Sequence, residues 1–378
     1  MKKSDLKVMT VVGTRPEIIR LSRTMALLDE YLTQVVVHTG QNYDFELNEV
    51  FFSEMEIRKP DHFLAVDTSS LGAAVGDIIR KSEAVMKQEK PDALLVLGDT
   101  NSCLSAYMAK RMHIPIFHME AGNRSFDFNV PEEVNRRIID HIADFNLVYT
   151  EHARRHLISE GLPHRRIYLT GSPMKEVLDH NQPKISSSRI LDQLSLTPGE
   201  YFVVSVHREE NVDRPANLAK ILDILNRLAA AYALPVIVST HPRTRKRLGM
   251  LSGYTPDPLI RFLKPFGFPD YIFLQQHARC TLSDSGTISE ESAILNFPAI
   301  SLRQSMERPE AQDTGTIILT GFEPRRVLDA VALAMDEYKA GARRHIPAEY
   351  LIADTSWRVL KLITGNTGLS NLWHGIHA

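Results

Sequence analysis

The pattern that predicts the fold is clearest in residues 8–19, which read VMTVVGTRPEII. A strand-length run ends abruptly at Gly13, and Pro16 then suits the first turn of a helix. Apolar residues continue beyond it at helical spacing, at Ile18, Leu21, Met25, Leu28 and Leu32. A strand that leads directly into an amphipathic helix is typical of the β-α units that build parallel sheets.

The same alternation of short runs and helical stripes recurs along the chain. The runs, many rich in Val and Ile, cover residues 8–12, 34–38, 93–97, 114–118, 146–149, 167–169, 201–206, 235–240, 260–263, 280–283, 299–302 and 316–319. They show no clean polar alternation, as is usual for strands buried on both faces of a parallel sheet. The sequence therefore predicts the α/β class.

The runs divide evenly, six before residue 175 and six after residue 200, which predicts two doubly wound domains in a chain of 378 residues. Residues 181–188, NQPKISSS, are polar and rich in helix breakers, so we expect the linker there. The expected domains are residues 1–180 and 181–355. The remaining residues, 356–378, form an expected C-terminal helix that packs back on the first domain.

Composition narrows the class of function. Lys and Arg total 44 and Asp and Glu total 46, so the net charge of −2 gives no basic surface for nucleic acids or for anionic membranes. No apolar stretch is long enough to span a membrane, and no signal-peptide core follows the N-terminus. Cys103 and Cys280 lack the spacing of a disulfide framework or a zinc site. We expect a cytoplasmic protein without a metal.

Two acidic residues follow runs in the first half of the chain. Asp99 comes after Gly98 at the end of the run 93–97, and Glu120 follows the run 114–118. Ligands of such sheets bind outside the carboxyl ends of the strands, so both carboxylates are candidates for chemistry. Asp99 has an equally ordinary interpretation as a helix N-cap.

Two helix starts in the same half add charged groups. The stretch Gly13–Glu17 places Arg15 where a guanidinium and free helix N–H groups can bind an anion, although an ordinary strand-to-helix turn explains it as well. Glu132 and Glu133 begin another helix, where the helix dipole by itself favours acids.

The second half supplies donors and cations. His207-Arg208 and His241 follow its first two runs. Residues 283–291, SDSGTISEE, combine a strand end, a small-residue turn and a helix start, which is the geometry that cradles a phosphate on backbone N–H groups. Acids in one half and phosphate-binding groups in the other predict an enzyme that moves protons on a sugar nucleotide or a similar phosphate ester.

Seven motifs, taken in order, resemble those of the non-hydrolysing UDP-N-acetylglucosamine 2-epimerases. They are Gly13–Glu17, Gly98–Thr100, His118–Gly122, Pro131–Arg136, His207-Arg208, Asp284–Glu291 and Glu307–Glu310. The resemblance covers the chain from about Lys7 to the C-terminal helix. It implies a GT-B fold of two Rossmann-like domains around a cleft, a homodimer, and catalysis without NAD or any other cofactor.

The resemblance also implies a mechanism and assigns residues to it. A base removes the C2 proton while UDP leaves C1, and the resulting 2-acetamido glycal is protonated on the other face before UDP adds back. Asp99, Glu120, Glu132 and His207 match the catalytic positions, with the acids in the first domain. The expected substrate-binding residues, with UDP held by the second domain, are Arg15, Arg20, Arg136, Arg208, His241, Tyr271, Ser285, Gly286, Thr287, Glu291 and Arg308.

Several positions depart from the commonest members of that family. Arg20 replaces a Lys, Asn123 replaces a Leu, and Thr287 replaces the second Gly of a Ser-Gly-Gly turn. Residues 40–44, GQNYD, replace a stretch that helps bacterial members bind a second UDP-N-acetylglucosamine as an activator, so we expect no such activation here.

These departures resemble the branch that converts UDP-2-acetamido-2,6-dideoxy-L-talose to UDP-N-acetyl-L-fucosamine for capsule or O-antigen. The alternative is conversion of UDP-N-acetylglucosamine to UDP-N-acetylmannosamine. Three other functions are alternatives: a GT-B glycosyltransferase, a hydrolysing epimerase and a two-lobed sugar-binding protein. The glycosyltransferase needs no set of three acids, and the sugar-binding protein needs a signal peptide and an aromatic-lined cleft.

Overall fold

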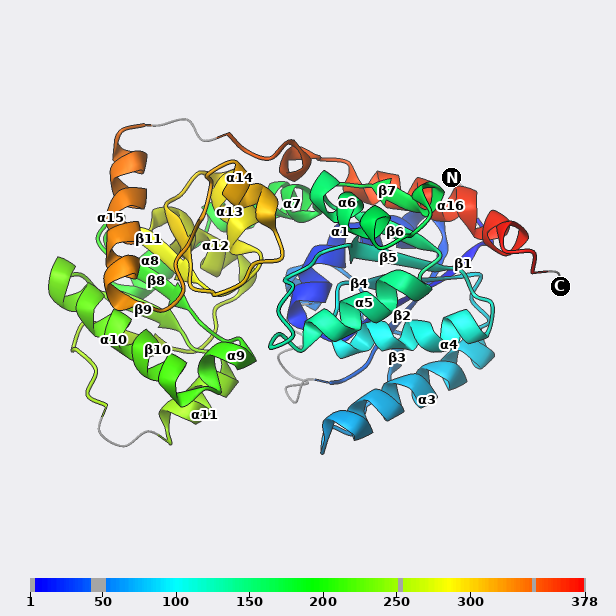
Figure 1. The fold of residues 1–378 in the computed structure, drawn as a ribbon, viewed down its shortest axis with the longest axis horizontal. Helices are drawn as coiled ribbons and strands as arrows, with labels where there is room; N and C mark the ends of the chain where they lie inside the picture. Colours follow the sequence, from blue (N-terminus) through cyan, green and yellow to red (C-terminus); the bar gives the residue numbers. More distant parts are fainter. Residues whose placement is uncertain (1–3, 42–51, 251–253, 342–344, 377–378) are drawn as a thin grey trace. The chain divides into compact units, whose positions relative to one another are not determined.

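The computed structural model describes residues 4–41, 52–250, 254–341 and 345–376, and it divides the chain into two compact units (Figure 1). Unit 1 comprises Met1–Arg124, Pro131–Asp179 and Ala348–Ala378. Unit 2 comprises Ser125–Val130 and His180–Pro347. Every strand pairing in the two sheets is parallel, as the uninterrupted apolar runs predicted.

Unit 1 contains a seven-stranded sheet in the order β3-β2-β1-β4-β5-β6-β7. Its strands are β1 (Lys7–Val12), β2 (Thr33–His38), β3 (His62–Phe63), β4 (Ala93–Leu97), β5 (Ile116–Ala121), β6 (Phe145–Val148) and β7 (Ile167–Leu169). The strand order reverses between β1 and β4, which is the topological switch of a doubly wound sheet.

Helices cover both faces of this sheet. They are α1 (Arg15–Tyr31), α3 (Leu71–Glu89), α4 (Ala106–Arg111), α5 (Glu132–Ile142), α6 (Glu151–Ser159) and α16 (Thr355–Trp373). Buried side chains of α3, α4 and α5 share one apolar cluster with β1, β2, β4 and β5. The C-terminal helix α16 packs on α1, and it lies on the other side of the sheet from α3 (Figure 1).

Unit 2 repeats the arrangement with six strands in the order β10-β9-β8-β11-β12-β13. The strands are β8 (Phe202–Ser205), β9 (Val236–Ser239), β10 (Ile260–Leu263), β11 (Cys280–Ser283), β12 (Ala299–Ser301) and β13 (Ile318–Leu319). The helices are α8 (Ile190–Leu194), α9 (Glu209–Val212), α10 (Pro215–Tyr232), α11 (Pro242–Leu248), α12 (Phe268–His277), α13 (Ile288–Leu295), α14 (Pro309–Asp313) and α15 (Pro324–Lys339). One apolar cluster joins the sheet to α10 and α15, and a second joins it to α8 and α12.

Each of the twelve predicted runs overlaps a strand, so the prediction of two doubly wound parallel sheets is confirmed. The sequence does not predict β3, because two residues that include a histidine form no apolar run. The predicted run at 114–118 ends too early. The strand β5 continues to Ala121 and therefore contains Glu120.

The expected linker, residues 181–188, starts beside the point at which the chain passes from unit 1 to unit 2, between Asp179 and His180, but it is mostly helical. The helix α7 (Met174–Ser186) passes through most of that segment, with Pro183 inside it. Apolar and small polar side chains at helical spacing, among them Val177, Asn181 and Ile185, are buried. Burial of this stripe outweighs the hydrogen bond that a proline removes.

The unit boundaries also differ from those expected in two places. Residues 348–355 group with unit 1 rather than with the second domain. The short segment Ser125–Val130 groups with unit 2, where Ser305 Oγ donates to Asp127 Oδ2 at 3.3 Å and Arg214 Nη2 donates to Asn129 Oδ1 at 2.8 Å.

Within the described part of the chain, no helix combines the length and the apolar character needed to cross a membrane.

The last residue of β2, His38, is a buried histidine whose environment favours the neutral ring. Its side chain is fully buried, and its ring stacks on Phe63 with centroids 5.3 Å apart. Its Nδ1 accepts the N–H of Gly40 at 3.0 Å, which requires an unprotonated Nδ1. Burial lowers the pKa of His38 from 6.5 to about 4.

This lowered pKa predicts a loss of stability in weak acid. Between about pH 6.5 and pH 4 the unfolded chain binds a proton at this residue that the folded chain does not, so the free energy of unfolding falls as the pH falls, by up to about 1.4 kcal/mol per pH unit. We expect His38→Asn, which retains an acceptor for Gly40, to reduce this slope in urea unfolding measured across that window. Parallel curves for the wild type and the variant would show that His38 makes no such contribution.

Candidate active site

The first cluster of candidate residues lies at the carboxyl ends of β4 and β5 in unit 1. These strands are neighbours in the sheet, with Leu97 opposite Met119. Asp99 follows β4, and Glu120 lies one residue before the end of β5. A Cβ placed on Gly98 would lie 3.6 Å from Glu120 Oε2, so the Glu120 carboxylate lies against the turn that carries Asp99.

A β-bulge directs Glu120. The register of β5 against β6 shifts between Met119 and Ala121, and Glu120 between them has a φ of 63°. A non-glycine residue in this left-handed region costs roughly 1–3 kcal/mol and is concentrated at functional sites. The bulge therefore changes the direction of the Glu120 side chain from the one that a regular strand would give it, at a cost in backbone strain.

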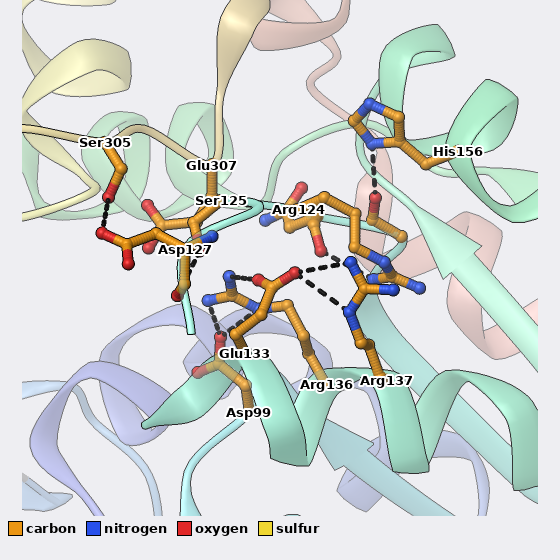
Figure 2. Close-up of polar contacts among 12 residues, drawn as sticks. Asp99, Arg124, Ser125, Asp127, Glu133, Arg136, Arg137, His156, Ser305 and Glu307 are labelled. Atoms are coloured by element: carbon orange, nitrogen blue, oxygen red, sulfur yellow. Dashed lines mark hydrogen bonds and ion pairs between the residues drawn. The ribbon is translucent and has the colours of Figure 1, made fainter. Parts of the chain in front are cut away.

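Each of the two carboxylates has an arginine partner. Arg136 on α5 donates to Asp99 through Nε at 3.0 Å and through Nη2 as well (Figure 2). Arg20 on α1 forms an ion pair with Glu120, and both side chains are only about a tenth exposed, at 10% and 11%. Asn123 adds a contact of 3.4 Å from its Nδ2 to Glu120 Oε1. The cluster is therefore charge-balanced rather than a bare group of acids.

Helix N-termini carry two further predicted residues. Glu132 is the first residue of α5, one turn before Arg136, and Arg15 is the first residue of α1. Both side chains are partly buried. The neighbouring Glu133 is fully buried and binds Arg136 and Arg137 (Figure 2). Its carboxylate therefore belongs to an ion-pair network, and the helix dipole does not explain it.

Glu17 holds the loop before Arg15, a role that its sequence motif does not predict. Its carboxylate accepts from Gly13 N at 3.1 Å, from Thr14 Oγ1 at 2.7 Å and from the hydroxyl of Ser102. Burial raises the pKa of Glu17, and these hydrogen bonds lower it in part. The one signal in the sequence for this role is that Glu17 lies in the first turn of a helix whose following residues are apolar.

The second cluster lies at the carboxyl ends of β8, β9 and β11 in unit 2, with His207 and Asp284 at its centre. His207 Nδ1 is 3.0 Å from Asp284 Oδ1, and the histidine side chain is 37% exposed. The fully buried Asp284 also accepts the backbone N–H groups of His207 and Arg208 and the Nδ2 of Asn211. Asp284 fixes the ring through Nδ1, an arrangement that orients Nε2 for chemistry.

Burial by itself would raise the pKa of Asp284. The charge of His207 and the hydrogen bonds from His207, Arg208 and Asn211 outweigh burial and lower the pKa to about 2. The sequence motif that contains Asp284 does not predict this role, because an acid in a strand-to-helix turn does not by itself indicate which donors the fold brings to it.

Cations surround the small-residue turn at Ser285–Thr287. Arg208 Nε donates to the carbonyl of Asp284 at 3.0 Å, and Arg308 forms a buried ion pair with Glu290. A Cβ placed on Gly286 would lie 3.9 Å from both arginine side chains. Ser285 and Thr287 share a hydroxyl contact of 2.9 Å. Thr287 has a φ of −73°, so the position that is Gly in the family pattern needs no glycine here.

The remaining predicted residues of unit 2 differ in their surroundings. His241 is exposed, its ring is 5.8 Å from that of His207, and its Nδ1 accepts the N–H of Arg243. Tyr271 on α12 packs partly buried against an apolar cluster. Glu291 on α13 is buried and accepts from Gln275 Nε2 at 3.1 Å. The expectation about an activating nucleotide rests on residues 40–44, of which residues 42–44 lie outside the described residues.

The lowered pKa of Asp284 predicts a specific acid sensitivity. A carboxylate with a pKa of about 2 in the folded chain and 3.8 as its ordinary value contributes about 2 kcal/mol of stability above pH 4, and this is lost as the pH falls toward 2. We therefore expect Asp284→Asn to be less stable than the wild type at pH 6, with a difference that narrows as the pH falls from 5 to 3 in urea unfolding. A difference independent of pH would contradict a charged Asp284.

Comparison with known proteins places the chain among sugar-nucleotide enzymes. The sequence pattern of the family described as UDP-N-acetylglucosamine 2-epimerase matches residues 26–364. The UDP-N-acetylglucosamine 2-epimerase of Methanococcus maripaludis is 35% identical over 335 residues, which cover 86% of this chain and 90% of the relative.

Solved structures agree with this assignment. A structure of UDP-N-acetylglucosamine 2-epimerase from Rickettsia bellii has a TM-score of 0.90 and 48% identity, and the match covers 98% of this chain and 100% of that chain. The Methanocaldococcus jannaschii enzyme in complex with UDP-GlcNAc and UDP has a TM-score of 0.88 and 31% identity, over 95% of this chain and 99% of that chain. With the two parallel sheets, these neighbours confirm the predicted GT-B fold. The chain therefore belongs to the UDP-N-acetylglucosamine 2-epimerase family, whose members are isomerases.

Proposed function

We propose that this protein inverts C2 of a UDP-N-acetylhexosamine by eliminating UDP to a 2-acetamido glycal and adding it back. One observation carries the proposal. Asp99 and Glu120 lie on neighbouring strand ends, and each is paired with an arginine. Inversion at carbon requires proton removal from one face and delivery to the other, so at least two acid–base groups must flank the sugar.

In this mechanism the residues of unit 1 move the proton. The C2–H bond is not acidic, so its cleavage must be coupled to departure of the diphosphate from C1. Asp99, Glu120 and Glu132 are the proposed acid–base groups. Arg136 and Arg20 hold the first two of these carboxylates in defined orientations through ion pairs, which keeps each within reach of one reacting atom.

The residues of unit 2, together with Arg15, serve the leaving group. His207, oriented by Asp284, and Arg208, held beside the Ser285–Thr287 turn, supply positive charge and hydrogen-bond donors for the diphosphate. The backbone N–H groups at the start of α13 add the electrostatics of a helix N-terminus. Stabilising the departing UDP is what allows a weak carbon acid to lose its proton.

The proposed substrate is UDP-2-acetamido-2,6-dideoxy-L-talose, converted to UDP-N-acetyl-L-fucosamine for capsule or O-antigen. Support comes from Arg20 and Asn123, two positions that depart from the commonest family pattern. Both contact Glu120, one of the proposed acids, so the departures fall on the group that handles the sugar. The second candidate is the UDP-N-acetylglucosamine to UDP-N-acetylmannosamine reaction, which the names of the similar enzymes favour.

We also propose that the protein acts in the cytoplasm as a homodimer and without a nucleic-acid partner. Two buried cysteines with free thiols suit a reducing compartment. A net charge of −2 gives no bulk attraction to nucleic acids. Light scattering of the purified protein tests the dimer, and the mass of a single chain would contradict it.

An incubation in D₂O separates the two candidate substrates. The enzyme is mixed separately with the UDP-linked 6-deoxy-L-talo and L-fuco sugars and with UDP-N-acetylglucosamine, and NMR follows deuterium at C2. We expect both 6-deoxy sugars to exchange and interconvert, since the reaction is reversible, with UDP-N-acetylglucosamine at least about tenfold slower. Preferred turnover of UDP-N-acetylglucosamine would instead establish the second candidate, and release of free sugar and UDP would indicate a hydrolysing enzyme.

Isosteric amides test the three acids. Asp99→Asn, Glu120→Gln and Glu132→Gln retain size and hydrogen bonding but cannot exchange a proton, so each should slow epimerisation by about 10²–10⁴-fold. At least one should release glycal and UDP, because elimination continues slowly while reprotonation stalls. Near-wild-type epimerisation by all three variants would end the mechanism. A defect confined to one of them would leave the other two as binding or structural residues.

A further inference from the structure

A buried histidine on β5 connects the backbone of the two loops that carry Asp99 and Glu120. His118 is fully buried in the middle of β5. Its Nε2 is 2.8 Å from the carbonyl oxygen of Gly98, the residue before Asp99. Its Nδ1 is 2.9 Å from Oδ1 of Asp140 on α5, which is also fully buried.

The Asp140 carboxylate extends this connection to Glu120. Both of its oxygens accept the backbone N–H of Gly122 at 3.2 Å, two residues after Glu120. The carbonyl oxygen of Gly122 is in turn 2.9 Å from His156 Nδ1. Gly122 has a φ of 80°, and a Cβ there would lie 2.4 Å from the carbonyl oxygen of Ala153, so only glycine fits at this position.

Arg124 completes the attachment on the far side of the turn. Its Nη1 donates to Asp140 Oδ2 at 2.6 Å and to the carbonyl oxygen of Asn123 at 2.7 Å. Its Nε and Nη2 donate to Glu160 at 2.8 and 2.6 Å. The segment that follows Glu120 is thus tied to Asp140 both directly and through Arg124.

We propose that His118 and Asp140 are positioning residues that set the Glu120 carboxylate relative to Asp99. The inference rests on the proposed function, in which both carboxylates serve the same sugar. The path of contacts runs from Gly98 through His118 and Asp140 to Gly122, so one buried pair fixes the backbone beside each acid. Productive geometry tolerates an error of about 0.5 Å, which a bulged strand end does not hold unaided.

A purely stabilising role explains this arrangement less well. The buried ion pair of Asp140 with Arg124 gains little over well-packed apolar residues of the same volume, because removing two charges from water is costly. The opposite end of β5 offers a comparison. Asp144 is 3% exposed, accepts the N–H of Ile116 at 3.0 Å and binds Lys110 at 2.7 Å. It ties down the same strand at its amino end, away from both carboxylates.

Asp140→Asn and the matched control Asp144→Asn separate positioning from stability. Both remove one buried charge that ties down β5. We expect Asp140→Asn to lower kcat by about 10–100-fold with KM within about threefold, and Asp144→Asn to lower Tm but leave kcat of the folded protein within about twofold. His118→Gln, which can replace only one of the two ring contacts, should give an intermediate loss of kcat and serves if Asp140→Asn does not fold. Equal kcat values for the two Asn variants, with an active wild type, would overturn the positioning role and leave the proposed function intact.

Hydrogen exchange gives a readout that does not depend on activity. In Asp140→Asn the amides of residues 98–99 and 120–124 should exchange at least about tenfold faster than in the wild type, whereas Asp144→Asn should loosen the region of Ile116. Unchanged protection at residues 98–99 would overturn the connection through His118. A wild type inactive on every UDP-hexosamine tested would count against the proposed function, and the exchange pattern would still decide whether the two loops are coupled.

Discussion

Parallel pairing brings the carboxyl ends of the strands of a sheet to one edge, and the chemistry of both units depends on that constraint. In unit 1 it places the turn after β4 beside the end of β5, so that the Glu120 carboxylate lies against Gly98. In unit 2 it places the ends of β8 and β11 together, so that Asp284 reaches the backbone of His207 and Arg208. Residues far apart in sequence become neighbours without any long excursion of the chain.

Both units hold their strand ends with the same kind of device, a buried aspartate that accepts backbone N–H groups and contacts Nδ1 of a histidine. Asp140 contacts His118 and Gly122, and Asp284 contacts His207 and Arg208. The two histidines differ in exposure. His118 is fully buried and its second nitrogen is occupied by Gly98, whereas His207 is 37% exposed. The first histidine therefore suits a positioning role and the second a direct role toward a ligand.

Charge balance is the second common feature. Asp99 and Glu120 in unit 1 pair with Arg136 and Arg20, and Arg208 and Arg308 in unit 2 pair with Glu307 and Glu290, each within its own unit. Such pairs contribute little net stability when buried, but they limit the orientations of each side chain. The strained backbone at Glu120 has a similar effect: it lowers the stability of the fold and fixes the direction of the Glu120 carboxylate.

The sequence by itself determined the α/β class, the two parallel sheets and the candidate acids, because apolar runs buried on both faces and charged residues just after them are local features of the chain. It also singled out His207 and Arg208. It did not disclose β3, the path of α7 through Pro183, or that Glu120 lies within β5. Only the tertiary structure decided that Asp284 orients His207, that Arg20 faces Glu120, and that His118 and Asp140 join the two acidic loops. The physical reason is that these contacts join residues on different elements, and their energies come from burial and from donors that the packed sheets and helices bring together.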